Sequence, residues 1–267
     1  MAEPAVGLLH PGEMGAALGA ALRARGAPVL WASEGRSAAT AARAQEVGLE
    51  DVDSVAELVL RSEVLLSVCP PHAALEVARS VAGYAGLYID ANAVSPVTAR
   101  AIAASVGARC VDGSVIGPPP RGGASTRLYL SGPEASLVAA LFAGTLVEAR
   151  IVAGEIGAAS AVKMAYAAWT KGTAALLLGI RDLARVEDVE GALLEEWRLS
   201  LPGLEDQSNR AARTAAVKGW RWVGEMEEIA ATFAAAGLPG GFHLAAAEVF
   251  RTSSPDRERV WSLGETS

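Results

Sequence analysis

The sequence has few of the residues that form disulfide frameworks, metal sites or nucleic-acid interfaces. It contains two cysteines, Cys69 and Cys110, which lie far apart in apolar, strand-like segments without metal-ligand spacing. We therefore expect reduced, buried thiols and no metal site. The formal net charge is −7 and no run of lysine and arginine occurs, which argues against nucleic acid as the main partner.

Long apolar runs are lacking as well. The longest uncharged segment, residues 229–247, is interrupted by a Gly-Leu-Pro-Gly-Gly sequence and contains a histidine, so it is a poor membrane span. Because the first residues lead straight into a predicted strand, we expect no signal peptide and a cytoplasmic protein. Apolar residues make up 51% of the 267 residues, enough for one large domain or two smaller ones.

The first half of the chain alternates short apolar runs with helical patterns, which predicts βαβ units around a parallel sheet. A capping box from Ser54 to Glu57 predicts the start of a short helix. Residues 1–153 are thus predicted to form a Rossmann-type α/β domain. Strands are expected at residues 4–9, 28–32, 63–69, 87–91, 109–115, 127–131 and 147–152, and helices at 13–25 and 37–46.

The second half is predicted to be an all-helical domain, residues 154–267, entered through a long interdomain helix. Residues 154–187 lack proline and are apolar on nearly every side, which predicts a buried helix. Arg221, Glu225 and Glu228 recur at helical spacing and predict a solvated salt-bridge face. Because this half cannot bury its apolar faces alone, we expect a homodimer. Further helices are expected at 189–199, 204–217, 219–236 and 241–251.

Polar residues on the long helix fall along one stripe. At about 100° per residue, Lys163, Tyr166 and Thr170 share a face with Ser160. A lysine among alanines costs free energy unless it has a partner or a function, although many lysines reach solvent at a helix end. The neighbouring hydroxyls favour a cleft, so we interpret Lys163 as a catalytic residue and Tyr166 as the next candidate. His243, at the start of the last helix, is expected to be structural unless it faces this cleft.

The junction between the first strand and the first helix reads GLLHPGEMG, residues 7–15. In the dinucleotide motif G-x-G-x-x-G, the glycines form the tight turn and let the backbone approach the pyrophosphate. Here His10 replaces the first glycine, while Gly12 and Gly15 keep the second and third places. The pyrophosphate would bind the free N–H groups of the helix. The expected cofactor contacts at this turn are His10, Pro11, Gly12, Glu13 and Met14.

The end of the second strand, WASEGRS, predicts which dinucleotide binds. An NAD site would place a carboxylate here for the ribose hydroxyls. Ser33, Arg36 and Ser37 instead favour the 2′-phosphate of NADP(H), although Glu34 lies among them and Arg36 is open to a merely solvated role. The carboxyl end of the fourth strand, at Cys69 and Pro70, is where open α/β sheets bind ligands.

Four segments together resemble the β-hydroxyacid dehydrogenases, relatives of 6-phosphogluconate dehydrogenase. They are GLLHPGEMG at 7–15, DANAVSP at 90–96, DGSVIGP at 112–118 and SAVKMAYAAWTKG at 160–172. The HPG sequence, the segment around Lys163 and residues 221–243 are similar to a subgroup of uncharacterised phosphogluconate-dehydrogenase-like proteins with a distinct C-terminal domain.

The resemblance implies an NADP(H)-dependent oxidoreductase that transfers hydride between the nicotinamide and a small alcohol or carbonyl compound, in a cleft between two domains of a homodimer. It implies that Lys163 is the general acid or base, and burial would lower the pKa of such a lysine toward the working pH. It also implies a cofactor contact at Asn92. The implied substrate contacts are Ile116, Gly117 and Pro118, with Thr170 added from the helix stripe.

Departures from the family pattern leave the substrate open. The asparagine that the family places four residues after the lysine is Ala167, the Ser-Gly-Gly loop reads Ile116-Gly117-Pro118, and the serine after the fifth strand is Asn92. Two alternatives therefore remain. The first is an imine reductase acting on C=N bonds, and the second is a non-catalytic protein that senses NADPH.

Overall fold

The computed structural model describes residues 3–107, 109–122 and 125–252. The chain divides into two compact units, Met1–Met164 and Ala165–Ser267. This division falls inside one helix, α7 (Ala158–Val186). The domain boundary expected between residues 153 and 154 therefore stays a prediction.

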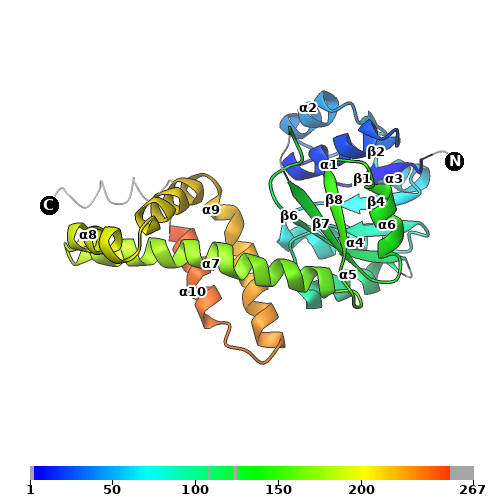
Figure 1. Ribbon diagram of the computed structural model, residues 1–267. Helices are drawn as coiled ribbons and strands as arrows, with labels where there is room; N and C mark the ends of the chain where they lie inside the picture. Colours follow the sequence, from blue (N-terminus) through cyan, green and yellow to red (C-terminus); the bar gives the residue numbers. More distant parts are fainter. Residues whose placement is uncertain (1–2, 108, 123–124, 253–267) are drawn as a thin grey trace. The chain divides into compact units, whose positions relative to one another are not determined.

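The N-terminal unit is built on an eight-stranded sheet with the order β3-β2-β1-β4-β5-β6-β7-β8 (Figure 1). The neighbouring strands are parallel, apart from β6 and β7, which are antiparallel. The predicted α/β fold is thus confirmed, with two differences in the sheet: β3 was not predicted, and β7 runs against its neighbour β6. Three helices of this unit, at Ala74–Ser80, Pro96–Val106 and Ala135–Leu141, were not predicted either. The strands are β1 (Val6–Leu8), β2 (Val29–Trp31), β3 (Glu50–Asp51), β4 (Val64–Ser67), β5 (Leu87–Asp90), β6 (Cys110–Ile116), β7 (Thr126–Ser131) and β8 (Val147–Ile151).

Helices cover both faces of the sheet (Figure 1). On one face Leu22 of α1 and Val138 of α6 pack against strand residues such as Ile89, and on the other Ile102 of α5 packs in a cluster with Tyr88. Side chains that alternate along β5 thus enter opposite cores, as the pleat of a strand requires. The helices are α1 (Glu13–Ala24), α2 (Ala38–Glu46), α3 (Val55–Arg61), the short η1 (Pro71–Ala73), α4 (Ala74–Ser80), α5 (Pro96–Val106) and α6 (Ala135–Leu141).

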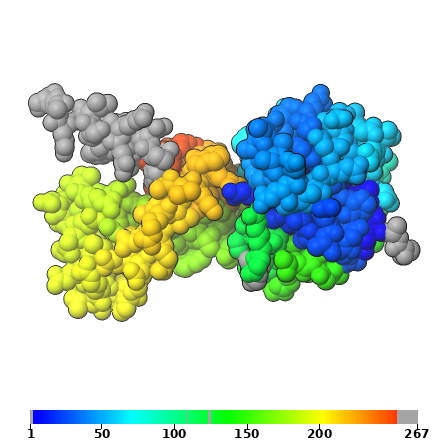
Figure 2. Space-filling model, turned by 90° about the horizontal axis from the view of Figure 1, so that it is seen from above, coloured from blue at the N-terminus to red at the C-terminus, as the bar shows by residue number. Residues whose placement is uncertain are grey.

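Residues of α1 and α2 form much of the surface that Figure 2 presents on the N-terminal unit, drawn in blue. Side chains cap α2 and α3, and the cap at Ser54 was predicted from the sequence. Ser37 Oγ accepts a hydrogen bond from the Thr40 amide, and Ser54 Oγ accepts one from the Glu57 amide. These bonds satisfy N–H groups that a helix start otherwise leaves without partners.

The C-terminal unit consists of the later part of α7 and three further helices, α8 (Glu190–Ser200), α9 (Leu204–Ala235) and α10 (Gly241–Thr252). The two helices expected at 204–217 and 219–236 are one continuous helix, which corrects the prediction. Gly219 does not end α9, because a single glycine costs a helix only about 1 kcal/mol and its bare backbone is buried beside Phe250. Trp222 of α9 meets Phe250 edge-on, with ring centroids 5.0 Å apart.

Two expectations about the surface of this unit are wrong. The α7 helix is not buried on nearly every side, since Tyr166 is 48% and Trp169 72% exposed in the single chain. The charged face of α9 is not simply solvated either. Glu225 forms a 2.5 Å ion pair with Lys171 of α7, and their side chains are only 17% and 14% exposed. Among the described residues, no helix is both long and apolar enough to span a membrane.

Candidate functional site

The β1–α1 turn leaves the first N–H groups of α1 without a side-chain cap. Gly12 is the N-cap residue, and no side chain of the described residues caps the helix there. A Cβ atom at Gly12 would meet no atom within 4 Å, so space is open in front of the helix start. A Cβ atom at Gly15 would lie 2.2 Å from the His10 carbonyl oxygen, so this position requires glycine. Such a helix start, with its positive dipole end, can bind an anion.

His10, in the place of the first glycine of the motif, carries no charge near neutral pH. Burial and then the nearby Arg36 lower the pKa of His10 to about 4. Its Nδ1 atom is buried and has no hydrogen-bond partner among the described residues. The adjoining Pro11 is buried, Glu13 is exposed, and Met14 packs against the core of the sheet.

Two arginines of the α2 region hold the turn by its carbonyl groups. Arg36 Nη2 donates to the Leu9 oxygen at 3.1 Å, and Arg43 Nη1 donates to the Pro11 oxygen at 3.0 Å. The Nε atom of Arg36 is buried without a partner among the described residues. Sequence reasoning identified Arg36 but missed Arg43, which lies within α2 and reaches the turn from there.

The end of β2 also differs in detail from the expectation. Ser37 is engaged as the N-cap of α2, and the Ser33 amide donates to Oδ1 of Asp51 at 3.2 Å. Asp51 ends β3, the strand that was not predicted. A carboxylate from a different strand therefore lies at this edge, in addition to Glu34.

Asn92 joins the loops that follow β4 and β5. Its Oδ1 atom accepts a 2.6 Å hydrogen bond from the Cys69 amide, and its Nδ2 donates to Ser67 Oγ and to Asp90. Three residues predicted separately, Cys69, Pro70 and Asn92, thus come together at the carboxyl edge of the sheet. Burial raises the pKa of the Cys69 thiol to about 12, so the thiol stays protonated.

Two buried carboxyl groups face the same side of the sheet in adjacent strands. Asp90 of β5 pairs in register with Asp112 of β6, and each is only 1% exposed. Burial and then the charge of Asp112 raise the pKa of Asp90 to about 7, against the opposing effect of its bonds with Asn92. Asp112 accepts hydrogen bonds from Ser131, Gly157 and Ser160. Asp90 therefore keeps its proton up to about pH 7.

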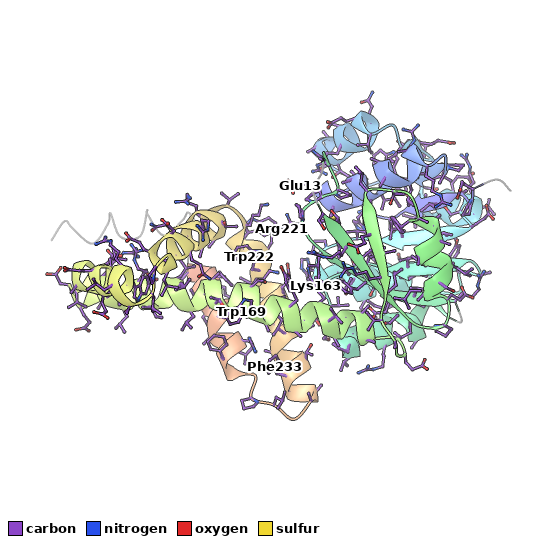
Figure 3. The ribbon with its side chains drawn as sticks, viewed as in Figure 1. Glu13, Lys163, Trp169, Arg221, Trp222 and Phe233 are labelled. Atoms are coloured by element: carbon purple, nitrogen blue, oxygen red, sulfur yellow. The ribbon has the colours of Figure 1, made fainter. Side chains whose placement is uncertain are left out.

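Lys163 lies on the part of α7 next to the sheet (Figure 3). Its Nζ atom donates to the carbonyl oxygen of Val115 in β6 at 2.8 Å. Ile116 is buried at the end of that strand, Gly117 has a φ of 122°, and the Pro118 oxygen accepts a hydrogen bond from Thr126. The structure thus brings the lysine to the strand that continues into the predicted substrate loop.

The other candidates belong to the C-terminal unit. Tyr166 is 48% exposed, and Thr170 is exposed with its hydroxyl bonded to the Tyr166 carbonyl at 3.3 Å. Their roles stay predictions. His243 is buried in α10 against Phe233, with ring centroids 4.3 Å apart, and burial lowers its pKa.

The C-terminal part of the chain matches a known family of undetermined role. Residues 184–253 match the model described as a domain of unknown function, DUF1932. An uncharacterised 28.5 kDa protein from the 7S RNA 5′ region of Methanothermus fervidus is 31% identical over 165 residues. The match covers 61% of this chain and 64% of that protein, so the chain spans less than two thirds of the relative.

Solved structures share the fold over nearly the whole chain. A conserved protein of unknown function, described as structurally similar to 3-hydroxyacid dehydrogenases, is 27% identical with a TM-score of 0.70 and covers 96% of this chain and 98% of its own. A 3-hydroxyisobutyrate dehydrogenase from Mycobacterium tuberculosis (19% identity, TM-score 0.68) covers 93% of both chains. A reductive aminase from Aspergillus terreus, described with NADPH (20% identity, TM-score 0.58), covers 94% of this chain and 93% of its own.

The last two likenesses show the fold alone. Together with the family match, the fold defines a β-hydroxyacid dehydrogenase-like protein with a distinct C-terminal domain, as the sequence motifs predicted.

The buried carboxyl pair generates a prediction about stability. The folded-state pKa of Asp90 is raised from 3.8 to about 7, so the folded protein holds this proton more tightly than the unfolded chain does. The resulting stabilisation of the fold is complete below about pH 4 and is lost as the pH rises through 7. Asparagine at this position mimics the protonated acid and does not titrate. The unfolding free energy of the unaltered protein, minus that of Asp90→Asn, should fall by on the order of 4 kcal/mol over this range.

Urea unfolding at a series of pH values measures this difference. The control is Asp188→Asn, an exposed residue with a φ of 54° that asparagine tolerates, and its difference should stay constant. A constant difference for Asp90→Asn would show that Asp90 is ionised in the folded protein.

Proposed function

We propose that this protein is an NADP(H)-dependent oxidoreductase that transfers hydride between the nicotinamide and a small alcohol or carbonyl compound. The proposal is carried by one observation: Lys163 is hydrogen-bonded to β6, at the carboxyl edge of the same sheet that presents the uncapped start of α1. Dehydrogenases and reductases occur among the structures of similar fold.

The residues present fit a dinucleotide. The open space at Gly12 and the first N–H groups of α1 would receive the pyrophosphate. The Nε atom of Arg36 would donate to the 2′-phosphate, with Ser33 and Ser37 beside it. The loops that carry Cys69, Pro70 and Asn92 would line the rest of the cofactor site. When bound, the nicotinamide supplies or accepts the hydride.

Lys163 would hold the proton that accompanies this hydride. In reduction its ammonium group donates a proton to the oxygen that becomes an alcohol, and in oxidation the amine accepts it. An ammonium has three N–H donors, so the bond to the Val115 carbonyl fixes its direction and still allows donation to a substrate oxygen. Ile116, Gly117, Pro118 and Thr170 would contact the substrate, and Tyr166 is the second candidate for proton transfer.

We further propose that the protein forms a homodimer through its helical unit. Large apolar or aromatic residues of α7 recur at three- and seven-residue spacing, the pattern of a helix seam. Four of them are large and exposed: Tyr166 at 48%, Trp169 at 72%, Leu176 at 49% and Leu183 at 62%. A second copy of the chain would cover this seam with the same residues, since an isologous pair is the commonest closed assembly.

Cofactor selectivity tests the role of Arg36. NADPH should bind at least about tenfold more tightly than NADH, a difference of about 1.4 kcal/mol, and Arg36→Ala should remove most of it. Titration of each cofactor by protein fluorescence gives the dissociation constants. Arg43→Ala is the matched control, because loss of its bond to Pro11 should weaken both cofactors equally. Equal affinities in the unaltered protein would refute NADP selectivity.

Turnover tests the role of Lys163. Lys163→Ala and Lys163→Met should lower kcat by about 10²- to 10⁴-fold, the usual contribution of a positioned acid, and leave NADPH affinity nearly unchanged. Lys218→Ala, at an exposed lysine of α9, is the control and should keep full activity. If the variants keep turnover on preformed iminium substrates but lose it on carbonyl substrates, the result favours the imine reductase alternative. Unchanged turnover on every substrate would leave Lys163 structural.

Molar mass in solution tests the dimer. Light scattering at micromolar concentration should give twice the chain mass of 27.3 kDa. Trp169→Glu and Leu176→Glu should shift the protein toward monomer, because a charge cannot be buried in an apolar seam without a partner. Leu146→Glu, an exposed leucine of the N-terminal unit, should leave the mass unchanged. A stable monomer of the unaltered protein would contradict the proposal.

A further inference from the structure

The start of α7 is capped by a side chain from a distant strand. The first N–H groups of a helix have no partner within the helix. Here the amides of Gly157 and Ser160 donate to Oδ2 of Asp112 at 2.9 and 3.0 Å, and Ser160 Oγ donates to Oδ1 at 2.6 Å. Asp112 belongs to β6, so these bonds attach the helix to the sheet.

Ser131 of β7 completes the cap. Its hydroxyl donates to Oδ2 of Asp112 at 2.9 Å and accepts from the Ala159 amide at 3.0 Å. The two neighbouring amides in this first turn also have partners. The Ala158 amide donates to the Glu155 carbonyl oxygen, and the Ala161 amide donates to the Gly157 carbonyl oxygen. Asp112, Ser131 and Ser160 are at most 1% exposed, so water cannot replace these bonds if the carboxylate is removed.

Lys163 follows one helical turn after Ser160, on the same face of α7. Its Nζ atom bonds the Val115 carbonyl, three residues after Asp112 along β6. One strand therefore holds the helix at two points, by the carboxylate of Asp112 and by the carbonyl that receives the lysine. A rotation or slide of α7 that broke the first contact would also displace the second.

We propose that Asp112 is the positioning residue for Lys163: its buried carboxylate fixes the first turn of α7 and so sets the place of the lysine Nζ at the end of β6. Asp112 acts through the helix and does not itself touch the substrate or the cofactor. The importance of this for catalysis rests on the proposed function of Lys163, whereas the positioning itself can be measured without a substrate.

The test uses the small number of lysines. The sequence contains three, Lys163, Lys171 and Lys218, so protein labelled with ¹³C at the lysine ε-carbon gives three side-chain signals. Lys163→Met identifies the signal of Lys163. In Asp112→Asn, an amide faces donors that require an acceptor, so the Lys163 signal should move at fixed pH. The signals of Lys171, paired with Glu225, and of the exposed Lys218 should stay in place.

Milder variants keep the test decisive if Asp112→Asn does not fold. Ser160→Ala removes the bond to Oδ1 and Ser131→Ala removes one to Oδ2, and each should move the Lys163 signal in the same direction by a smaller amount. Asp90→Asn, on the neighbouring strand and without a bond to α7 among those described, is the matched control and should leave the signal unchanged.

An unmoved Lys163 signal in the folded variants would overturn the proposal, as would equal movement of all three lysine signals. Once a substrate is known, Asp112→Asn should lower kcat by about 10²-fold, the effect of a displacement of about 1 Å, without changing NADPH affinity. If the signal moves but Lys163→Ala turns over normally, the proposed function fails and the positioning by Asp112 stands.

Discussion

The N-terminal unit depends on a row of buried polar side chains that crosses four adjacent strands of the sheet. Ser67, Asp90, Asp112 and Ser131 are neighbours in register across β4, β5, β6 and β7, and none is more than 1% exposed. Buried polar groups destabilise a fold unless they are hydrogen-bonded. Here the row is hydrogen-bonded to the Asn92 side chain and to the start of α7. The same bonds therefore hold the loop at Cys69, through Asn92, and the helix that carries Lys163.

Periodicity predicted seven of the eight strands and the first three helices of the first half, but not α4, α5 or α6. Two differences in the sheet have physical causes. Strand β3 has only two residues, too few to show any period, and β7 reverses direction, which its own side-chain alternation does not report. The sequence predicted two helices that meet at residue 218, but α9 is continuous there, and burial against Phe250 compensates for the low helix propensity of Gly219.

The candidate site also contains residues that the sequence could identify and residues that it could not. Local sequence could identify the glycine turn, Arg36 and Lys163, because a motif or a helix face carries the signal. It could not identify Arg43, Asp51 or Asp112 as partners of these residues, because their contacts join segments that are far apart in the chain. The i, i+4 pattern of α9 likewise suggested a solvated surface, whereas Glu225 pairs with Lys171 on a different helix.

We propose that the dinucleotide would bind at the carboxyl edge of this sheet, with its nicotinamide beside Lys163. A crystal structure of the NADPH complex tests this proposal most directly. We expect the pyrophosphate on the first N–H groups of α1 and the nicotinamide ring on the side of the site where Lys163 lies. A nicotinamide ring turned away from Lys163, or a pyrophosphate bound elsewhere than at Gly12, would contradict it.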